Sequence, residues 1–328
     1  MKEILGHLLE HKTLSKEEAK ATLLSISKGE VNTSQTVAFM TVFMMRSIAV
    51  QELEGFRDCM LELCNAIDLS EFDPIDLCGT GGDGKDTFNV STCASFVVAG
   101  AGVKVAKHGN HGVSSSVGSS TVMEHFGYTF TNNKDVLKKQ IDKTGICFMH
   151  APLFHPAMKF VAPLRKELGM KTFFNMLGPM INPAMPNKQM VGVFSLELAR
   201  LYGYLYQQTE KEFMVVHSLD GYDEISLTGS FKVITQKKEQ LFTPETIGFK
   251  KLNAKELSGG NSIEDAAKIF TNVLENKASS AQKDVVLANA GMGIWCARPS
   301  ISKEEALSQA KESLASGSAL KVFKQLIS

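Results

Sequence analysis

The sequence predicts an α/β protein: a small all-helical N-terminal domain, and a large domain with a central, mostly parallel sheet flanked by helices. Residues 1 to about 68 carry only helical patterns, and Pro74 then marks a boundary because proline resists helix continuation. From Ile75 onward, short apolar runs alternate with helical stretches, which is typical of parallel sheets covered by helices. We expect a small domain over 1–70 with a return segment at about 165–186, and a large domain over 71–164 and 187–328.

Composition and charge narrow the class of protein. The chain has 328 residues, 44% of them hydrophobic and 21% charged, as in ordinary soluble globular proteins. Lys and Arg total 35 and so do Asp and Glu, so no bulk charge attracts nucleic acid or an anionic membrane. No apolar run of about 20 residues and no signal-peptide pattern is present. The six cysteines form no C-x-x-C pair, which indicates reduced core thiols and a cytoplasmic location.

The N-terminal residues predict four helices. Ile4, Leu5, Leu8 and Leu9 form one apolar face of the first, and Ser15 with Glu18 forms a capping box for a second that ends near residue 29. The third and fourth span 34–46 and 51–65. Their methionines and phenylalanines are typical of a core or of a helix–helix interface.

The sequence of the large domain alternates between the apolar pattern of strands and that of helices. We expect strands at 75–77, 103–106, 146–149, 189–193 and 213–217, with helices at 90–99, 119–126, 135–144 and 196–208. A helix at 160–168 and a proline-rich hinge at 172–186 interrupt this order. Residues 231–242 and the segment to 257 predict strands with an edge hairpin. Helices at 262–275, 284–296, 302–316 and 319–327 complete the chain, and residues after 231 carry no catalytic pattern.

A glycine loop follows the first strand. Four glycines fall within six residues, at Gly79, Gly81, Gly82 and Gly84, and a helix begins near Val90 with Asn89 or Ser91 placed to cap it. Glycine lets the loop backbone approach a ligand closely, and the helix N-terminus favours anions. The loop lacks the Gly-Lys-Ser/Thr ending of a P-loop and the distant acidic residue of a dinucleotide site. By itself it leaves phosphate binding and a plain tight connection equally open.

A second polar loop strengthens the phosphate interpretation. Lys107-His108-Gly109-Asn110 opens a stretch of glycines and hydroxyl side chains that leads to a helix near Ser119. Loops that follow successive parallel strands open on the same edge of the sheet, where ligands bind in such folds. This loop adds a cation and hydroxyl donors to that edge.

Two adjacent carboxylates follow a later strand. Asp223 and Glu224 come after the apolar run that ends at His217. Neighbouring carboxylates repel each other unless a cation lies between them, although a solvated turn is an alternative. Beside two phosphate loops, a Mg²⁺ site is the better interpretation, because Mg²⁺ is bound by one or two carboxylates together with substrate phosphates.

The motifs together resemble those of the anthranilate phosphoribosyltransferases over nearly the whole chain. The similar stretches are Gly79-Thr80-Gly81-Gly82-Asp83-Gly84, Thr87 to Thr92, Lys107 to Asn110, Asn175 to Pro179 and Asp223-Glu224. The glycine loop is shared with pyrimidine nucleoside phosphorylases, so the Lys-His-Gly-Asn run and the acidic pair discriminate better. The resemblance implies transfer of a phosphoribosyl group from phosphoribosyl pyrophosphate to anthranilate in tryptophan biosynthesis. It also implies two Mg²⁺ ions per subunit and a homodimer formed through the small helical domain.

The resemblance assigns the site residues, and it assigns none as a general acid or base. Those for phosphoribosyl pyrophosphate are Gly79, Gly81, Gly82, Asp83, Thr87, Asn89, Val90, Ser91, Thr92, Lys107 and Ser119. Those for anthranilate are Gly79, His108, Asn110, His155, Arg165 and Gly178, with Arg165 meeting the carboxylate, which suits its guanidinium. Those for the metal are Ser91, Asp223 and Glu224.

Two departures from the family pattern are present. The family often has Arg at the place of His111 and Ala-Asp at the place of Ser120-Thr121. Unlike arginine, histidine carries a positive charge only at low pH, so we expect His111 to change the affinity for anions more than the type of reaction. Two alternatives remain at this point: a nucleoside phosphorylase-like enzyme that does not need the acidic pair, and a non-catalytic relative that binds nucleic acid.

Overall fold

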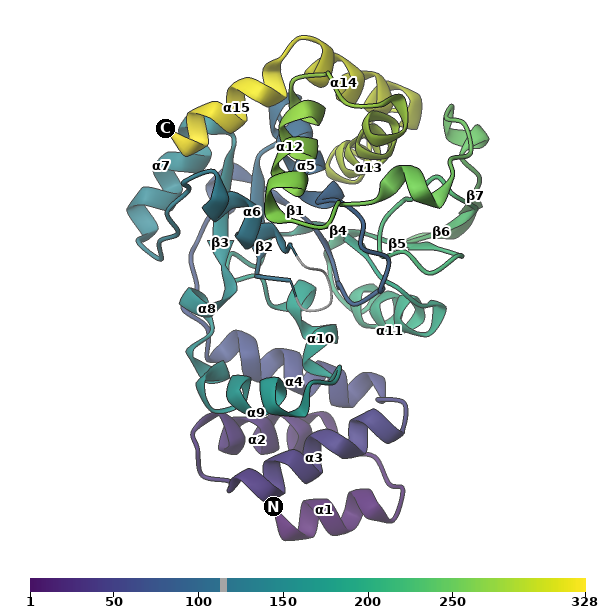
Figure 1. The fold of residues 1–328 in the computed structure, drawn as a ribbon. Coiled ribbons are helices and arrows are strands. Elements are labelled where there is room, and N and C mark those ends of the chain that lie inside the picture. The colour runs from purple at the N-terminus through teal and green to yellow at the C-terminus, as the bar shows by residue number, and fades with distance from the viewer. Residues whose placement is uncertain (113–116) are drawn as a thin grey trace. The chain divides into compact units, whose positions relative to one another are not determined.

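The computed structural model describes residues 1–112 and 117–328 (Figure 1). The chain divides into two compact units. The helical unit comprises Met1–Ala66 and Ala151–Pro183, and the α/β unit comprises Ile67–His150 and Ala184–Ser328. Among the helices of the described ranges, none is long and apolar enough to cross a membrane.

The helical unit starts with four α-helices, α1 to α4. Their bounds are Lys2–Leu9, Lys16–Ser27, Thr33–Met45 and Val50–Glu62. The predicted capping box is confirmed: Ser15 Oγ accepts the N–H of Glu18, and Glu18 Oε2 accepts the N–H of Ser15. The returning segment adds the short helices α8 (Ala151–Phe154), η2 (Pro156–Phe160), α9 (Ala162–Leu168), α10 (Phe174–Leu177) and η3 (Gly178–Ile181).

Aromatic side chains form the centre of this unit. Phe56 stacks on Phe173 with ring centroids 4.4 Å apart, and Phe39 and Phe43 meet both rings edge-on. These contacts join helices α3 and α4 to the returning segment, so the predicted core role of these phenylalanines is confirmed.

The α/β unit contains a seven-stranded sheet in the order β3-β2-β1-β4-β5-β6-β7. The strands are β1 (Ile75–Gly79), β2 (Val105–Gly109), β3 (Ile146–His150), β4 (Lys188–Gly192), β5 (Glu212–Ser218), β6 (Phe231–Thr235) and β7 (Glu239–Phe242). Strands β1 to β5 pair in parallel, and β6 and β7 add an antiparallel hairpin at the edge. With the helical unit, this is the predicted fold class.

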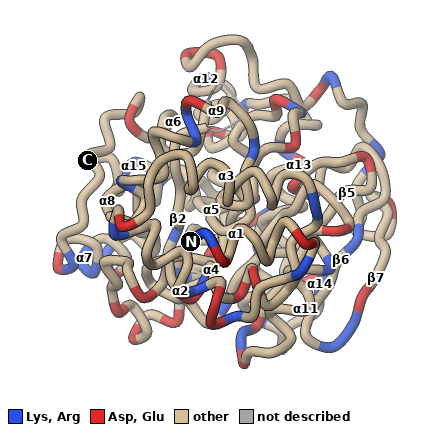
Figure 2. Tube along the Cα trace, turned by 90° about the horizontal axis from the view of Figure 1, so that it is seen from below, with Lys and Arg blue, Asp and Glu red and all other residues tan. Residues whose placement is uncertain are grey.

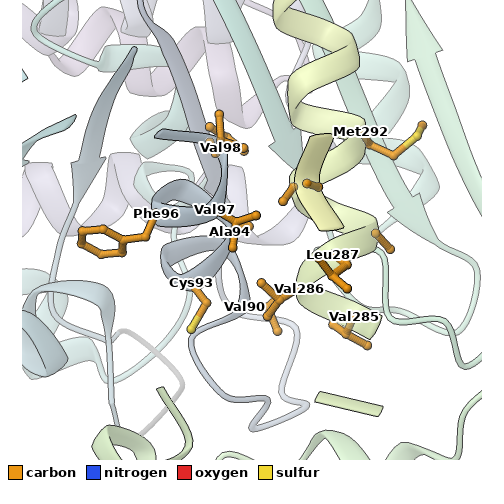
Figure 3. Close-up of a cluster of buried hydrophobic side chains, with 14 of the residues drawn as sticks. Val90, Cys93, Ala94, Phe96, Val97, Val98, Val285, Val286, Leu287 and Met292 are labelled. Carbon is orange, nitrogen blue, oxygen red and sulfur yellow. The ribbon is translucent and has the colours of Figure 1, made fainter. Parts of the chain in front are cut away.

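Helices cover both faces of the sheet. Helix α5 (Val90–Gly100) and helix α13 (Ser280–Ala297) pack against β1, and Leu77 belongs to their buried cluster. Figure 3 shows side chains of α5 and α13 in this cluster. On the opposite face, helix α11 (Leu196–Gln207) places Tyr206 against Phe213 of β5. The remaining helices are η1 (Ser70–Phe72), α6 (Ser119–His125), α7 (Lys134–Thr144), η4 (Glu245–Ile247), η5 (Ala254–Leu257), α12 (Ile263–Leu274), α14 (Lys303–Ala315) and α15 (Ser318–Ile327).

Several predicted elements need correction. The segment 243–257 forms the turns η4 and η5 rather than a strand, because Pro244 and the left-handed Gly248 break sheet pairing. The helix expected at 160–168 is η2 followed by α9, with Pro163 in the first turn of α9. The strand expected at 103–106 runs from Val105 to Gly109, because its pairing with β3 continues that far.

Charged positions of both signs are spread along the trace in Figure 2. This distribution agrees with the equal totals of 35 basic and 35 acidic residues.

The α/β unit also contains a buried polar group on the α11 face of the sheet, where Gln189 donates to Asp76 Oδ2 at 3.1 Å and accepts from Tyr206 Oη at 2.6 Å.

Candidate active site

The carboxyl ends of β1, β2 and β5 carry the three loops that the sequence singled out. The glycine loop follows β1, and Gly81, Gly82 and Gly84 have φ of 67°, 81° and 70°. This left-handed region favours glycine, so the sequence is fitted to the loop conformation. Thr80 fixes the start of the loop by donating its N–H to the carbonyl of Gly192 on β4, at 3.0 Å.

The acidic loop after β5 lies directly against the glycine loop. Asp223 Oδ2 accepts the N–H of Gly81 at 2.6 Å. A Cβ on Gly79 would lie 2.4 Å from Asp223 Oδ2, and one on Gly192 would lie 1.6 Å from the Asp223 carbonyl oxygen. Glycine is therefore required at both strand ends for Asp223 to approach. The structure thus brings together Gly79, Gly81 and Asp223, which are separate in the sequence.

Three acidic side chains influence one another at this place. Burial, followed by the nearby charge of Asp83, raises the pKa of Asp223 to about 7. Burial, followed by the charge of Asp223, raises the pKa of Glu224 well above its usual range, and a hydrogen bond from Thr87 opposes this rise. Glu224 is 8% exposed, and its Oε1 has no hydrogen-bond partner in the described ranges. The solvated-turn alternative is therefore wrong for this pair.

The donor set fits a divalent cation. A buried carboxylate oxygen without a partner, beside a second carboxylate, is stabilised by positive charge. The described residues contain no group of three or more His, Cys, Asp and Glu side chains that could enclose a metal. Two carboxylates without a full cage match Mg²⁺, which takes its remaining ligands from water and substrate phosphates. The Ser91 hydroxyl forms no hydrogen bond to either carboxylate within the described residues; the Ser91 carbonyl accepts Ser95 Oγ at 2.8 Å.

Lys107 is a strand residue rather than a loop residue. It lies within β2, is 1% exposed, and donates from Nζ to the carbonyl of Leu77 in β1 at 2.7 Å. Burial lowers the pKa of Lys107, and the nearby Asp76 carboxylate opposes that shift. The Lys107 side chain therefore contacts the strand that leads into the glycine loop. His108 follows it in β2 and is buried, with its N–H donating to Asp76 Oδ1 at 3.4 Å.

A hydrogen bond joins the two polar loops. Asn89, at the position before α5, donates from Nδ2 to the carbonyl of Val117 at 3.0 Å and does not cap the helix, so the predicted capping by this side chain is wrong. Its Oδ1 is buried without a hydrogen-bond partner among the described residues. Val90, Ser91 and Thr92 form the first turn of α5. The N–H of Val90 donates to the carbonyl of Phe88 at 2.6 Å, which leaves the N–H groups of Ser91 and Thr92 for an anion.

The second loop is held by Asn110 and Ser119. The Asn110 carbonyl accepts Ser119 Oγ at 3.3 Å and the N–H of Ser120 at 3.1 Å. His111 Nδ1 lies 3.2 Å from Thr121 Oγ1 and 3.8 Å from Glu124 Oε2, so the two departures from the family pattern contact each other. Val113 to Ser116, part of the expected run of hydroxyls, lie outside the described residues.

Arg165, His155 and Gly178 belong to the helical unit. Arg165 on α9 donates to Asn175 Oδ1 at 3.2 Å and lies over the Phe174 ring, 5.4 Å from its centroid. Burial lowers its pKa. Its Nε is buried without a hydrogen-bond partner among the described residues. A desolvated guanidinium of this kind favours an anionic ligand.

His155 and Gly178 are placed differently. His155 is 3% exposed, and burial lowers its pKa to about 4. It is therefore neutral at pH 7. A Cβ added to Gly178, at the start of η3, would meet nothing within 4 Å, so this glycine is not required by packing.

Sequence reasoning missed two supports of the site, both after residue 231. Residues 257–259 run antiparallel to 86–88: Gly259 donates to the Asp86 carbonyl at 2.9 Å, and Phe88 donates to the Leu257 carbonyl at 3.3 Å. Asn289 on α13 binds both backbone groups of Ile225, next to Glu224. Neither support is marked by a local sequence motif, because both bind backbone groups that are far away in the sequence.

Comparisons with known proteins agree with this geometry. Residues 71–320 match the model "Glycosyl transferase family, a/b domain", and residues 2–64 match "Glycosyl transferase family, helical bundle domain". The anthranilate phosphoribosyltransferase of Cytophaga hutchinsonii is 58% identical, with 100% of each chain covered. That of Flavobacterium johnsoniae is 60% identical over 99% of this chain and 98% of its own.

Solved structures agree as well. Anthranilate phosphoribosyltransferase from Thermus thermophilus superposes with a TM-score of 0.91 at 32% identity, covering 98% of both chains. The Saccharomyces cerevisiae enzyme in complex with PRPP and Mg has a TM-score of 0.90 at 28% identity, covering 98% of this chain and 95% of its own. Both domain models match in order, and relatives of at least 58% identity match over 98% or more of their length. The chain belongs to the anthranilate phosphoribosyltransferase family.

Proposed function

We propose that this chain transfers the phosphoribosyl group of phosphoribosyl pyrophosphate to the amine of anthranilate, giving N-(5-phosphoribosyl)anthranilate and pyrophosphate in tryptophan biosynthesis. One observation carries the proposal furthest: the glycine loop and the acidic loop are joined through Gly81 and Asp223, at 2.6 Å. An anion-binding backbone and a cation-binding pair thus occupy one place. A magnesium-dependent reaction of a pyrophosphate ester requires this combination.

The glycine loop, Lys107 and the first turn of α5 bind the donor in this proposal. Breaking the bond between ribose C1 and the pyrophosphate oxygen leaves positive charge on the ribose and negative charge on the pyrophosphate. In this proposal Gly79, Gly81, Gly82 and Asp83 lie against the donor. The preorganised N–H groups of Ser91 and Thr92, next to Val90, stabilise the negative charge as it develops, with Thr87, Asn89 and Ser119 as polar contacts. The glycine loop costs no reorganisation during the reaction, because Gly81, Gly82 and Gly84 already hold its conformation.

Magnesium is held by Asp223 and Glu224, with Ser91 as a further ligand. When bound, Mg²⁺ supplies positive charge to the phosphate oxygens of the donor. The unpartnered Oε1 of Glu224 and the raised pKa of Asp223, caused by its burial and by Asp83, support this assignment. Two ions per subunit is the number we propose, since two adjacent carboxylates are available to separate ions.

Arg165 binds the carboxylate of anthranilate, and His108, Asn110, His155, Gly79 and Gly178 complete the contacts proposed for this substrate. The unpartnered Nε of Arg165 supports its role, because a guanidinium pairs with a carboxylate through two parallel hydrogen bonds. The amine nitrogen of anthranilate forms the new bond to C1 as the bond from C1 to pyrophosphate breaks, and it then loses a proton to water. Its aromatic amine is unprotonated at neutral pH, so we assign no side chain as general base. Orientation of the two substrates provides the remaining acceleration.

We further propose a cytoplasmic homodimer formed through the helical unit. Leu9, Met45 and Met170 of that unit are 73%, 83% and 62% exposed, which supports an apolar contact there. All six cysteines are free thiols, which supports a reducing compartment.

Product analysis tests the reaction. Anthranilate, phosphoribosyl pyrophosphate and Mg²⁺ are incubated with the protein, and the phosphoribosylated anthranilate and the pyrophosphate are measured by mass spectrometry. The proposal predicts equal amounts of both products. Phosphate-dependent cleavage of thymidine or uridine, without the anthranilate product, would instead identify a nucleoside phosphorylase.

A further inference from the structure

Asn289 is a buried amide that binds the backbone on the carboxyl side of the acidic pair. It lies on α13 and is 4% exposed. Its Oδ1 accepts the N–H of Ile225 at 3.1 Å, and its Nδ2 donates to the carbonyl of Ile225 at 2.9 Å. The same Nδ2 donates to the carbonyl of Val285 at 2.9 Å, which fixes the side chain on its own helix. The amide therefore holds Ile225 by both of its backbone groups.

Other contacts hold the opposite side of the pair. Ser218 Oγ, at the end of β5, donates to the carbonyl of Glu224 at 2.6 Å. Gly192 of β4 lies so close to Asp223 that a Cβ there would meet the Asp223 carbonyl oxygen. Asp223 and Glu224 are thus fixed between the sheet edge and α13. The only side chain among the described residues that binds both backbone groups of Ile225 is Asn289.

Fixing this backbone has a function beyond folding. Asp223 and Glu224 are adjacent in the chain, so their carboxylates repel each other when no cation lies between them. A loop free to move would separate these carboxylates and lose the arrangement that a cation needs. Groups that hold ligands in place commonly control metal affinity by ten- to a hundredfold.

We propose that Asn289 is a positioning residue for divalent-cation binding, acting through the backbone of Ile225 on the Glu224 carboxylate. The inference rests on the proposed function only for the role of the acidic pair. It assigns a role to the C-terminal third of the chain, whose sequence carries no catalytic pattern.

The test compares Asn289→Ser with Ser313→Ala in the full-length protein. The serine keeps a hydroxyl that can bind Val285 but is too short to reach Ile225. Ser313→Ala removes a different buried hydrogen bond of the same unit, from Ser313 Oγ to the carbonyl of Val97 at 2.7 Å. Binding of Mn²⁺, used as a spectroscopic probe in place of Mg²⁺, is measured by electron paramagnetic resonance without substrates. We expect at least tenfold weaker binding in Asn289→Ser and less than twofold change in Ser313→Ala.

A double-mutant cycle separates positioning from general damage. In a Glu224→Gln background, Asn289→Ser should weaken Mn²⁺ binding by less than twofold further, because the carboxylate that it positions is gone. Wild-type affinity in Asn289→Ser, an equal loss in Ser313→Ala, or full additivity with Glu224→Gln would each overturn the proposal.

A measurement on the unaltered protein keeps the proposal open to refutation if the variants do not fold. Amide hydrogen exchange of the peptide containing Ile225 should be slow in the absence of cation, because Asn289 already holds that N–H. Fast exchange that becomes slow only when Mn²⁺ is added would show that the cation orders the loop, and would contradict positioning by Asn289. If the protein shows the expected Mn²⁺ binding and hydrogen exchange but no transferase activity, the proposed function is contradicted and the role of Asn289 is not.

Discussion

Asp223 accepts a hydrogen bond from the backbone N–H of Gly81 at 2.6 Å, although the two residues are 142 positions apart in the chain. This contact joins the loop after β1 to the loop after β5 across the intervening strand β4. The anion-binding glycines and the acidic pair therefore form a single structure, and a change in either loop reaches the other.

The acidic pair should bind Mg²⁺ and should be strained without it. Asp223→Asn with Glu224→Gln removes the repulsion among buried carboxylates, so we expect the variant to unfold at the same or a higher temperature than the wild type in chelator at pH 8. Added Mg²⁺ should raise the unfolding midpoint of the wild type only. Transferase activity should fall at least a hundredfold, as expected when several kcal/mol of charge stabilisation is lost. Glu197→Gln, on the exposed start of α11, is the matched control.

A methyl group at the end of β4 should damage the site by displacing the backbone of the acidic loop. A Cβ at Gly192 would lie 1.6 Å from the Asp223 carbonyl oxygen, so Gly192→Ala must displace the acidic loop. We expect at least a tenfold loss of kcat/KM and weaker Mg²⁺ binding. In Gly229→Ala, the new Cβ lies at an ordinary 3.7 Å from Asp220, and activity should stay within twofold. Similar activities for the two variants would show that the close approach of Asp223 is unimportant.

Arg165 should affect one substrate and not the other. Arg165→Lys keeps the charge but removes the planar pair of donors, and we expect the KM for anthranilate to rise about tenfold, or about 1.4 kcal/mol. The KM for phosphoribosyl pyrophosphate should change less than twofold. Lys166→Gln, an exposed neighbour on α9, should change neither value. A rise confined to the KM for phosphoribosyl pyrophosphate would remove Arg165 from the anthranilate contacts.

His155 should make stability depend on pH. Burial lowers its pKa to about 4, whereas a histidine in the unfolded chain titrates near 6.5. The unfolded state therefore binds more protons between these values, and stability is present above pH 6.5 and lost as pH falls. The loss from pH 7 to pH 5 amounts to about 2 kcal/mol. Urea unfolding at pH 7 and at pH 5 gives the loss of unfolding free energy between them. We expect this loss to be about 2 kcal/mol smaller in His155→Gln than in the wild type. Identical losses would contradict the assignment.

The fold class and the loops could be predicted because their signals are local. The glycines at 79–84 and the residues Lys107 to Asn110 lie next to short apolar strands, and loops that follow parallel strands open on one edge. The adjacency of Asp223 and Glu224 in the sequence was sufficient to suggest a cation site. Their burial was not predictable, because it depends on Gly79 and Gly192 lying against Asp223.

The supports of the site could not be predicted, since they act across long separations. Asn289 lies 64 residues from Ile225, and nothing in the apolar helix around it marks a polar contact. Leu257 and Gly259 bind residues 86–88 through backbone hydrogen bonds, which leave no pattern of side-chain types. Lys107 was expected in a loop, and only the pairing of β2 with β3 shows that it is a buried strand residue.

The most direct test of the account follows the fluorescence of anthranilate while Mg²⁺ is titrated into a mixture of enzyme and phosphoribosyl pyrophosphate. The account predicts loss of the signal only when protein, both substrates and Mg²⁺ are all present, and no loss with Asp223→Asn and Glu224→Gln combined. Loss of the signal at the wild-type rate with that double variant, or in excess chelator, would contradict the assignment of the joined glycine and acidic loops as the catalytic centre.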